Sequence, residues 1–209
     1  GYDIIPWLPV YAGRIIGSKD STSRFRNDLK AAISDMFAEY SYGIPREMIN
    51  KLGMQVLIEP YASSGVGPFN GNDVIPLADV PMTEFWSHQV KIAGANISAS
   101  GAFFGKDIIG AEAFTGSPEY SRWSESPAKL KFSGDVAFSN GVNRLILHHW
   151  VHQPFPDSIR PGMSMGRWGT HFGRNQTWFE PAKTWITYLN RCQYMLQKGS
   201  RVSDFLSLD

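Results

Sequence analysis

The stretch IIGAEAFTG, residues 108–116, decides the fold of this 209-residue chain. Its apolar start reaches a single carboxylate, Glu112, and small and polar residues follow at once. A strand that is buried on both faces and delivers one acid into a cleft has this pattern. An ordinary strand whose last residue meets solvent has it too, so the rest of the chain must decide.

The same pattern recurs along the chain. Four apolar segments end in polar or charged residues and lead into helix-like stretches: residues 54–60, 79–86, 107–115 and 144–154. This alternation is typical of βα units around a parallel sheet. It predicts an α/β fold.

Helices are expected where apolar residues recur at three- and four-residue spacing, over residues 24–43, 126–141 and 180–199. One face of the first contains Phe25, Leu29, Ala32, Ile33, Met36, Phe37 and Tyr40. Gly43 is its expected terminator, and Gly199 closes the last helix. Gly, Pro, Ser and Asn dominate residues 63–79 and 154–173, which are predicted to be long loops.

Composition limits the possible partners. The length suits one domain, residues 1–209. The chain has 20 Lys and Arg against 19 Asp and Glu, without a basic stripe, so nucleic acid is not expected as a partner. No apolar run reaches the roughly 18 residues of a membrane span, and no membrane partner is expected. The single Cys192 allows no intrachain disulfide.

Aromatic residues are abundant, with 7 Trp, 8 Tyr and 13 Phe. They are consistent with a Trp-rich core. They are also consistent with a concave site, because flat apolar rings match the C–H faces of sugars.

Ionisable residues follow the predicted strands at their carboxyl ends, where active sites of parallel α/β sheets and barrels lie. They are Glu59, Glu84, Glu112, His148, His149 and His152. Paired carboxylates are what glycoside hydrolysis requires, because one protonates the departing oxygen while the other activates water or attacks carbon. Several oxygen ligands at one rim could also hold calcium.

The segment HHWVHQP ends the fourth predicted strand. Two-residue alternation would place His148, Trp150 and His152 on one face and His149 on the other. The histidines could donate hydrogen bonds to hydroxyl groups or bind a transition metal.

Several catalytic motifs are missing from the sequence. It contains no P-loop, no GxGxxG after a strand, no HExxH, no CxxC and no GxSxG elbow. Nucleotide-binding, structural-zinc and serine-hydrolase interpretations therefore lose support.

Several long blocks occur in an order that resembles glycoside hydrolase family 106, the α-L-rhamnosidases. They are GYDIIPWLP at the start, AEAFT (111–115), the PAKLK and GDVAFSNGVNR block (127–144), HHWVHQP (148–154), GRWGTHFGRNQTW (166–178) and YLNRCQYMLQKG (188–199). The match runs from the first residues almost to the last.

The resemblance implies a (β/α)8 TIM barrel, of which this chain would supply the second half, about four to five βα units. It implies calcium-assisted, inverting hydrolysis of terminal L-rhamnosides in carbohydrates, and export to the periplasm or outside a bacterial cell. The family's general acid is expected in a DSxE-type segment ahead of GYD. The isolated chain is therefore expected to hydrolyse poorly and to need the N-terminal half of the enzyme as its partner.

The resemblance also implies roles for individual residues. Glu84 resembles the general base, and Glu112 a calcium ligand or a second catalytic carboxylate; the sequence leaves these two roles open. The expected sugar-pocket residues are Glu59, His148, Trp150, His152, Arg174 and Trp178, with Trp178 as a wall.

Two other functions are compatible with the same residues. One is a carbohydrate-binding relic of such a barrel without catalysis. The other, less supported, is a metal-dependent amidohydrolase-type barrel that uses His148, His149, His152 and His171.

Overall fold

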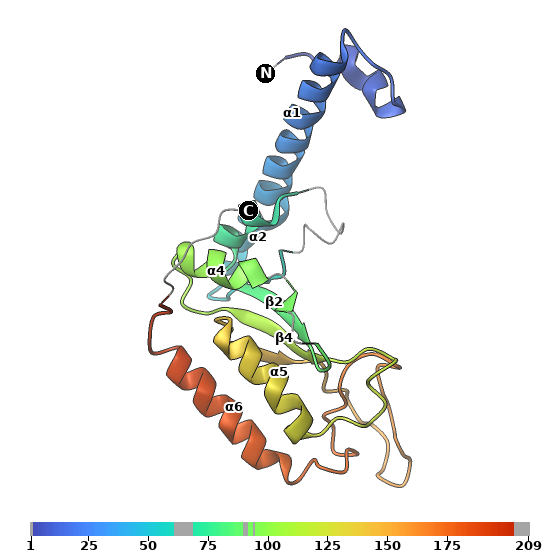
Figure 1. Cartoon of the computed structure of the whole chain (residues 1–209), viewed down its shortest axis with the longest axis vertical. Coiled ribbons are helices and arrows are strands. Elements are labelled where there is room, and N and C mark those ends of the chain that lie inside the picture. Colours follow the sequence, from blue (N-terminus) through green and yellow to red (C-terminus); the bar gives the residue numbers. More distant parts are fainter. Residues whose placement is uncertain (1, 61–68, 90–91, 94, 203–209) are drawn as a thin grey trace. The chain divides into compact units, whose positions relative to one another are not determined.

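The computed structural model describes residues 2–60, 69–89, 92–93 and 95–202 (Figure 1). The chain divides into two compact units, Gly1–Gln55 with Tyr61–Leu77 and Val56–Pro60 with Ala78–Asp209. The expected single domain, residues 1–209, stays a prediction. No helix in the described part of the chain is both long enough and apolar enough to cross a membrane.

The first unit is helical. Its elements are η1 (Ile5–Ala12), α1 (Lys19–Phe37), the π-helix η2 (Ala38–Gly43), α2 (Ile44–Lys51), α3 (Gly71–Val74) and η4 (Ile75–Leu77). A capping box begins α1, because the Ser18 hydroxyl accepts from the Ser21 amide while the Ser21 hydroxyl accepts from the Ser18 amide.

The predicted end of the first helix at Gly43 is wrong. Gly43 has a helical φ of −60°, and the chain continues through it into α2. Helical backbone needs no terminator where the following residues, Ile44 and Pro45, can start a new first turn. Part of the predicted apolar face is exposed, since Met36 is 58% and Tyr40 60% exposed, whereas Phe25 is buried.

The second unit is α/β. Its sheet has the strand order β1 (Leu57–Ile58), β2 (Val80–Trp86), β4 (Gly110–Thr115) and β5 (Arg144–Leu147), and these four strands are parallel. The short β3 (Ile92–Ala93) pairs antiparallel with β2. The prediction of an α/β fold with a parallel sheet is confirmed.

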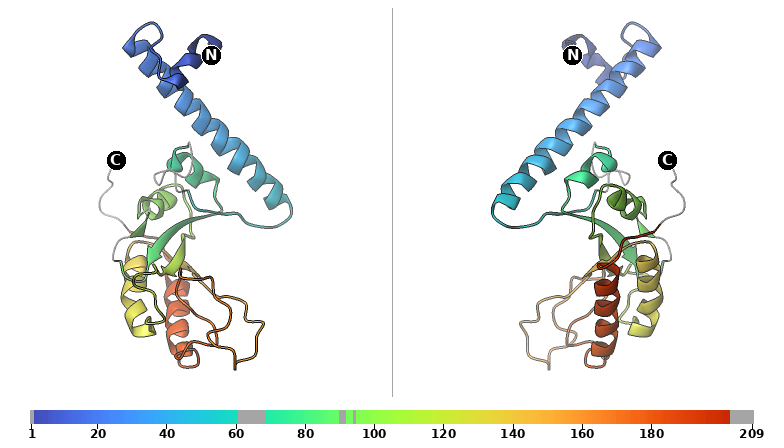
Figure 2. Two further views of the ribbon diagram at one scale, coloured as in Figure 1. Left: turned by 90° about the vertical axis from the view of Figure 1, so that its right-hand side faces the viewer. Right: turned by 90° about the vertical axis from the view of Figure 1, so that its left-hand side faces the viewer.

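Helices cover one face of this sheet. The unit contains α4 (Ala95–Phe103), α5 (Pro127–Ser139) and α6 (Ala182–Leu196), and Figure 2 shows α5 and α6 side by side against the sheet. Phe85, Ala111 and Ala113 point into the apolar core beneath them, which also contains Leu130 and Leu189. Residues one position away along each strand therefore point to the opposite face.

That opposite face carries the strand-end acids. Glu84 and Glu112 alternate with the core residues of β2 and β4, and Glu59 follows β1 by one residue. A parallel sheet with helices on one face and functional groups on the other is the layering of part of a (β/α) barrel. The structure thus agrees with the predicted partial barrel.

The fourth strand is shorter than predicted. It was expected over residues 144–154, but β5 ends at Leu147. The His148 amide still donates to the Ala113 carbonyl at 3.0 Å, whereas the His149 amide donates to the Thr170 carbonyl. Because the chain changes partners here, the predicted alternation of His148, Trp150 and His152 on one strand face is wrong.

Candidate active site

Glu84 and Glu112 are register partners on the neighbouring strands β2 and β4. Parallel strands lie about 4.8 Å apart, and side chains at paired positions leave the same face. Both carboxyl groups are partly buried. The structure therefore brings together the two acids that the sequence predicts as catalytic.

The pKa of Glu84 is raised from 4.5 to about 7. Partial burial is the main cause, followed by the negative charges of Glu112 and then Glu59; a hydrogen bond with the Trp86 side chain opposes them. Burial and like charge both disfavour the ionised form of a carboxyl group. Glu84 can thus exchange a proton near neutral pH.

Glu59 belongs to the same group of acids. Burial and the charge of Glu112 raise its pKa as well. Its side chain is more exposed than those of Glu84 and Glu112. It is therefore placed at the edge of the site.

Glu112 has one hydrogen-bond donor, Thr115, and one close neighbour, His148. The Thr115 hydroxyl donates to Glu112 Oε1 at 2.5 Å. His148 Nδ1 lies 3.3 Å from the same oxygen, although not with hydrogen-bond geometry. Burial lowers the pKa of His148, the Glu112 charge opposes this, and His149 adds to the lowering. His148 is therefore mainly neutral at pH 7, able to donate to or accept from a hydroxyl group.

His149 is buried. Its Nε2 lies 3.0 Å from the Trp168 carbonyl oxygen, which can only accept, so Nε2 carries the proton. The Thr170 amide donates to the His148 carbonyl at 2.9 Å, and the Gly169 amide donates to the Gly116 carbonyl at 2.8 Å. Residues 169–170 thus fasten the histidine pair to the end of β4.

A cluster of rings beside His149 was not predicted as a site; its two histidines are buried, whereas Trp123 is 37% exposed. His171 packs against His149 with ring centroids 6.0 Å apart, and Trp123 stacks on His171 at 4.0 Å. Burial and His149 lower the pKa of His171, while the Glu125 charge raises it. Within this cluster the sequence points only to His149 and His171, as histidines of the amidohydrolase-type alternative, because no strand or motif marks Trp123 and Glu125.

Trp150 and His152 follow the end of β5. Trp150 is 60% exposed, and its ring contacts Phe179 edge-on at 5.6 Å. His152 is exposed. Their sugar-pocket roles stay predictions.

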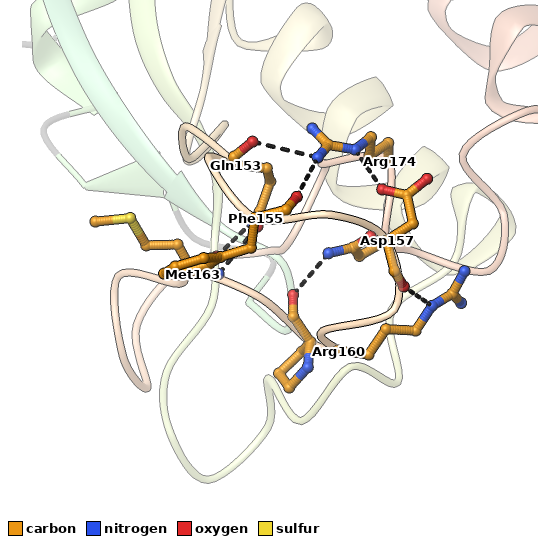
Figure 3. A network of polar contacts seen from close by, with 8 residues as sticks. Gln153, Phe155, Asp157, Arg160, Met163 and Arg174 are labelled. Atoms are coloured by element: carbon orange, nitrogen blue, oxygen red, sulfur yellow. Dashed lines mark hydrogen bonds and ion pairs between the residues drawn. The ribbon is translucent and has the colours of Figure 1, made fainter.

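Arg174 organises a loop (Figure 3). Its Nε donates to Asp157 Oδ1 at 2.7 Å, and its Nη2 donates to the carbonyl oxygens of Phe155, at 2.9 Å, and Gln153, at 3.2 Å. The Gln153 side chain in turn accepts from the Met163 amide at 2.9 Å. The predicted contact of Arg174 with a sugar hydroxyl remains untested, and its observed contacts are structural.

Trp178 packs on the helix side of the sheet. Its indole N–H donates to the Glu125 carbonyl at 2.6 Å, and its ring meets Phe172 and Trp185 edge-on at 5.9 and 6.3 Å. These partners belong to the apolar core, which the carboxylates do not face. The structure does not bring Trp178 to Glu84 and Glu112.

The described residues do not make a calcium site by themselves. Among them, no group of three or more His, Cys, Asp or Glu side chains is arranged to hold a metal ion. Calcium takes about six to eight oxygen ligands. Glu112 as a calcium ligand therefore stays a prediction.

Known proteins include relatives of this chain. A protein of Formosa agariphila named "Putative beta-glucuronidase" is 36% identical over 208 residues, which are 99% of this chain and 17% of that protein. The rhamnosidase structure from Novosphingobium sp. PP1Y superposes with a TM-score of 0.80 at 27% identity, covering 95% of this chain and 19% of that chain. The chain thus spans less than a fifth of the length of each.

The family model of glycoside hydrolase family 106, described as alpha-L-rhamnosidase, matches residues 1–208. This match argues against the amidohydrolase-type alternative, because the family is one of glycoside hydrolases. The carboxylates at the strand ends, the partial barrel and the match over nearly every residue agree, and the chain belongs to glycoside hydrolase family 106.

Proposed function

We propose that the second unit forms part of the active site of an α-L-rhamnosidase, with Glu84 as the general base that activates water. The observation that carries this proposal is the register pair of Glu84 and Glu112 in a chain of family 106. The Glu84 pKa of about 7 supports it, because a base works best when its pKa lies near the working pH.

In the proposed reaction, an ionised Glu84 takes a proton from a water molecule. The water oxygen attacks the anomeric carbon, and the leaving oxygen receives a proton from an acid on the other side of the bond, which inverts the configuration. The neighbouring Glu112 carboxylate offers negative charge to the oxocarbenium-like transition state. Neutral His148 can bind a sugar hydroxyl beside it.

The register pair favours a placement of Glu84 and Glu112 on the same side of the sugar. Paired positions on adjacent strands present their carboxyl groups from one direction, whereas the acid and base of an inverting enzyme lie on opposite sides of the bond. We therefore assign the proton donor to neither residue. Calcium assistance and export, which the family resemblance suggests, belong to the same proposal.

Glutamine variants of the full-length protein test the base. On an aryl α-L-rhamnoside, Glu84→Gln should lower kcat by about 10²- to 10⁴-fold, because the amide cannot accept the proton. Glu39→Gln, which changes an exposed acid of the first unit, should leave turnover unchanged. Wild-type turnover by Glu84→Gln would refute the assignment.

The pH profile and the product distinguish a base from an acid. A base must be ionised, so kcat/KM should rise with pH through about 7. NMR should detect the β-anomer of L-rhamnose first. A limb that falls through this range, or α-L-rhamnose as the first product, would show that Glu84 is not the base of an inverting enzyme.

A further inference from the structure

The end of β4 contains a β-bulge. Phe85 pairs with Ala113, but the next residue, Trp86, pairs with Thr115, so Phe114 is an extra residue in β4. Phe114 has a φ of 62°, in the left-handed region that a residue with a side chain rarely occupies. Bulges of this kind bend a strand and redirect the side chains that follow.

The core side of the sheet holds this bulge in place. Phe114 is 0% exposed, and its ring contacts Phe85 at 4.9 Å and Trp185 at 5.2 Å. Ala113 is buried in the same core, so two consecutive side chains of β4 point to the helix side. Thr115 is thereby returned to the face that carries Glu112.

The consequence is a contact that a regular strand could not make. Side chains three positions apart lie on opposite faces of an unbulged strand. Here the Thr115 hydroxyl donates to Glu112 Oε1 at 2.5 Å. The packing of Phe114 is thus connected to the orientation of a carboxylate in the candidate active site.

We propose that Thr115 is a positioning residue, whose hydroxyl holds the Glu112 side chain beside Glu84 while the bulge at Phe114 keeps Thr115 on that face. This rests on the proposed function of the two acids and adds the group that orients one of them. A hydrogen bond to a carboxylate oxygen favours its charged form and a single side-chain geometry. One Glu112 oxygen, Oε1, is occupied in this way.

The role of Thr115 can be tested by measuring how the Glu84 carboxyl group titrates. Because the Glu112 charge raises the Glu84 pKa, loosening Glu112 should lower the midpoint at which the Glu84 carboxyl group titrates. Carbon NMR of the labelled chain can follow that carboxyl group without any turnover. Wild type and Thr115→Ser should titrate near 7, and Thr115→Val should titrate at lower pH.

The variants separate a hydrogen bond from packing. Valine keeps the shape of threonine without the hydroxyl, whereas serine keeps the hydroxyl with less bulk. Should Thr115→Val fail to fold, Thr115→Ala compared with Thr115→Ser poses the same question. An unchanged or raised Glu84 midpoint in the variant without a hydroxyl would overturn the proposal, and so would a lowered midpoint in Thr115→Ser.

Kinetics give the second measurement. In the full-length protein, Thr115→Val should lose about 10- to 100-fold in kcat, the amount expected from a hydrogen bond to a charged group, with KM changed less than about threefold. Thr115→Ser should recover most of the rate. A normal rate for Glu84→Gln would refute the proposed function, whereas a normal Glu84 midpoint in Thr115→Val would refute only the role of Thr115.

Discussion

Glu84 and Glu112 are direct register partners, and the carboxyl groups of this pair share the face of the sheet that the helices do not cover. Two partly desolvated carboxylates in this position repel each other, and the folded protein relieves the repulsion by leaving a proton on Glu84 up to about pH 7. The arrangement that suits the proposed catalysis therefore costs stability once Glu84 ionises.

Replacing Glu84 by glutamine should make stability less dependent on pH. The folded pKa of about 7 lies above the ordinary 4.5, so the Glu84 contribution is complete below 4.5 and is lost as pH rises through 7. Since the side chain is only about half buried, solvent screening reduces the loss to about 1 kcal/mol. Urea unfolding at pH 4.5 and pH 8 should show wild type losing that much more stability than Glu84→Gln.

The matched control is Glu39→Gln, which removes an exposed carboxyl group from η2. Its free energy of unfolding should change between pH 4.5 and pH 8 as much as that of the wild type. If Glu84→Gln retained the full wild-type loss between the two pH values, Glu84 would not be the group that titrates.

The three acids should differ in their influence on Glu84. Glu112 contributes more than Glu59 to the raised Glu84 pKa. Glu112→Gln should therefore lower the midpoint of the Glu84 carboxyl group further than Glu59→Gln, as measured by carbon NMR of the chain. The reverse order would mean that Glu59, not the register partner, lies closer to Glu84.

Strand patterns predicted the sheet well because burial on the helix side imposes alternation. The predicted segments 79–86 and 107–115 contain β2 and β4, and the acids Glu84 and Glu112 are brought together as expected. The strand predicted over residues 144–154 ends at Leu147, because the backbone of His148 and His149 then forms hydrogen bonds with Thr170, which is distant in the sequence. Local sequence does not specify such a change of partner.

The positions of two further side chains, Thr115 and Trp178, could not be predicted from the sequence for a similar reason. Alternation places Thr115 opposite Glu112, and only the bulge at Phe114 reverses this. The family resemblance implies that Trp178 is a wall of the sugar pocket, and that role stays a prediction. An aromatic side chain suits a core equally well, and the contact of Trp178 with Trp185 on α6 is not visible in residue types.

Arg174 offers a test between a structural role and a sugar contact. Lysine keeps the charge but not the planar fork, so Arg174→Lys should lose the paired contacts with Asp157 and the loop carbonyls. We expect faster hydrogen exchange at the Met163 amide, whose acceptor Gln153 is held by Arg174, and little change in KM.

The comparison for this prediction is Arg160→Lys. Arg160 makes one hydrogen bond to the Asp157 carbonyl, at 3.1 Å, so its loss should affect Met163 exchange less. A higher KM for Arg174→Lys with unchanged Met163 exchange would instead support the sugar-contact role predicted from the sequence.

Two loop glycines provide a matched pair that tests the packing of the histidines. Gly166 and Gly169 have left-handed φ values of 79° and 83°. A Cβ at Gly166 would meet nothing within 4 Å, whereas one at Gly169 would lie 2.5 Å from His149 Cδ2 and 3.2 Å from His148 Nδ1. Gly166→Ala should cost only the backbone term of about 1–2 kcal/mol.

Gly169→Ala should cost more, by about 1–3 kcal/mol, because a rigid imidazole must move. Moving His148 should also weaken turnover in the full-length protein, since this ring lies 3.3 Å from Glu112. Thermal unfolding and steady-state kinetics of both variants give the comparison. Equal stability losses with equal turnover would show that Gly169 is there for its backbone conformation alone and that the histidine pair has room to shift.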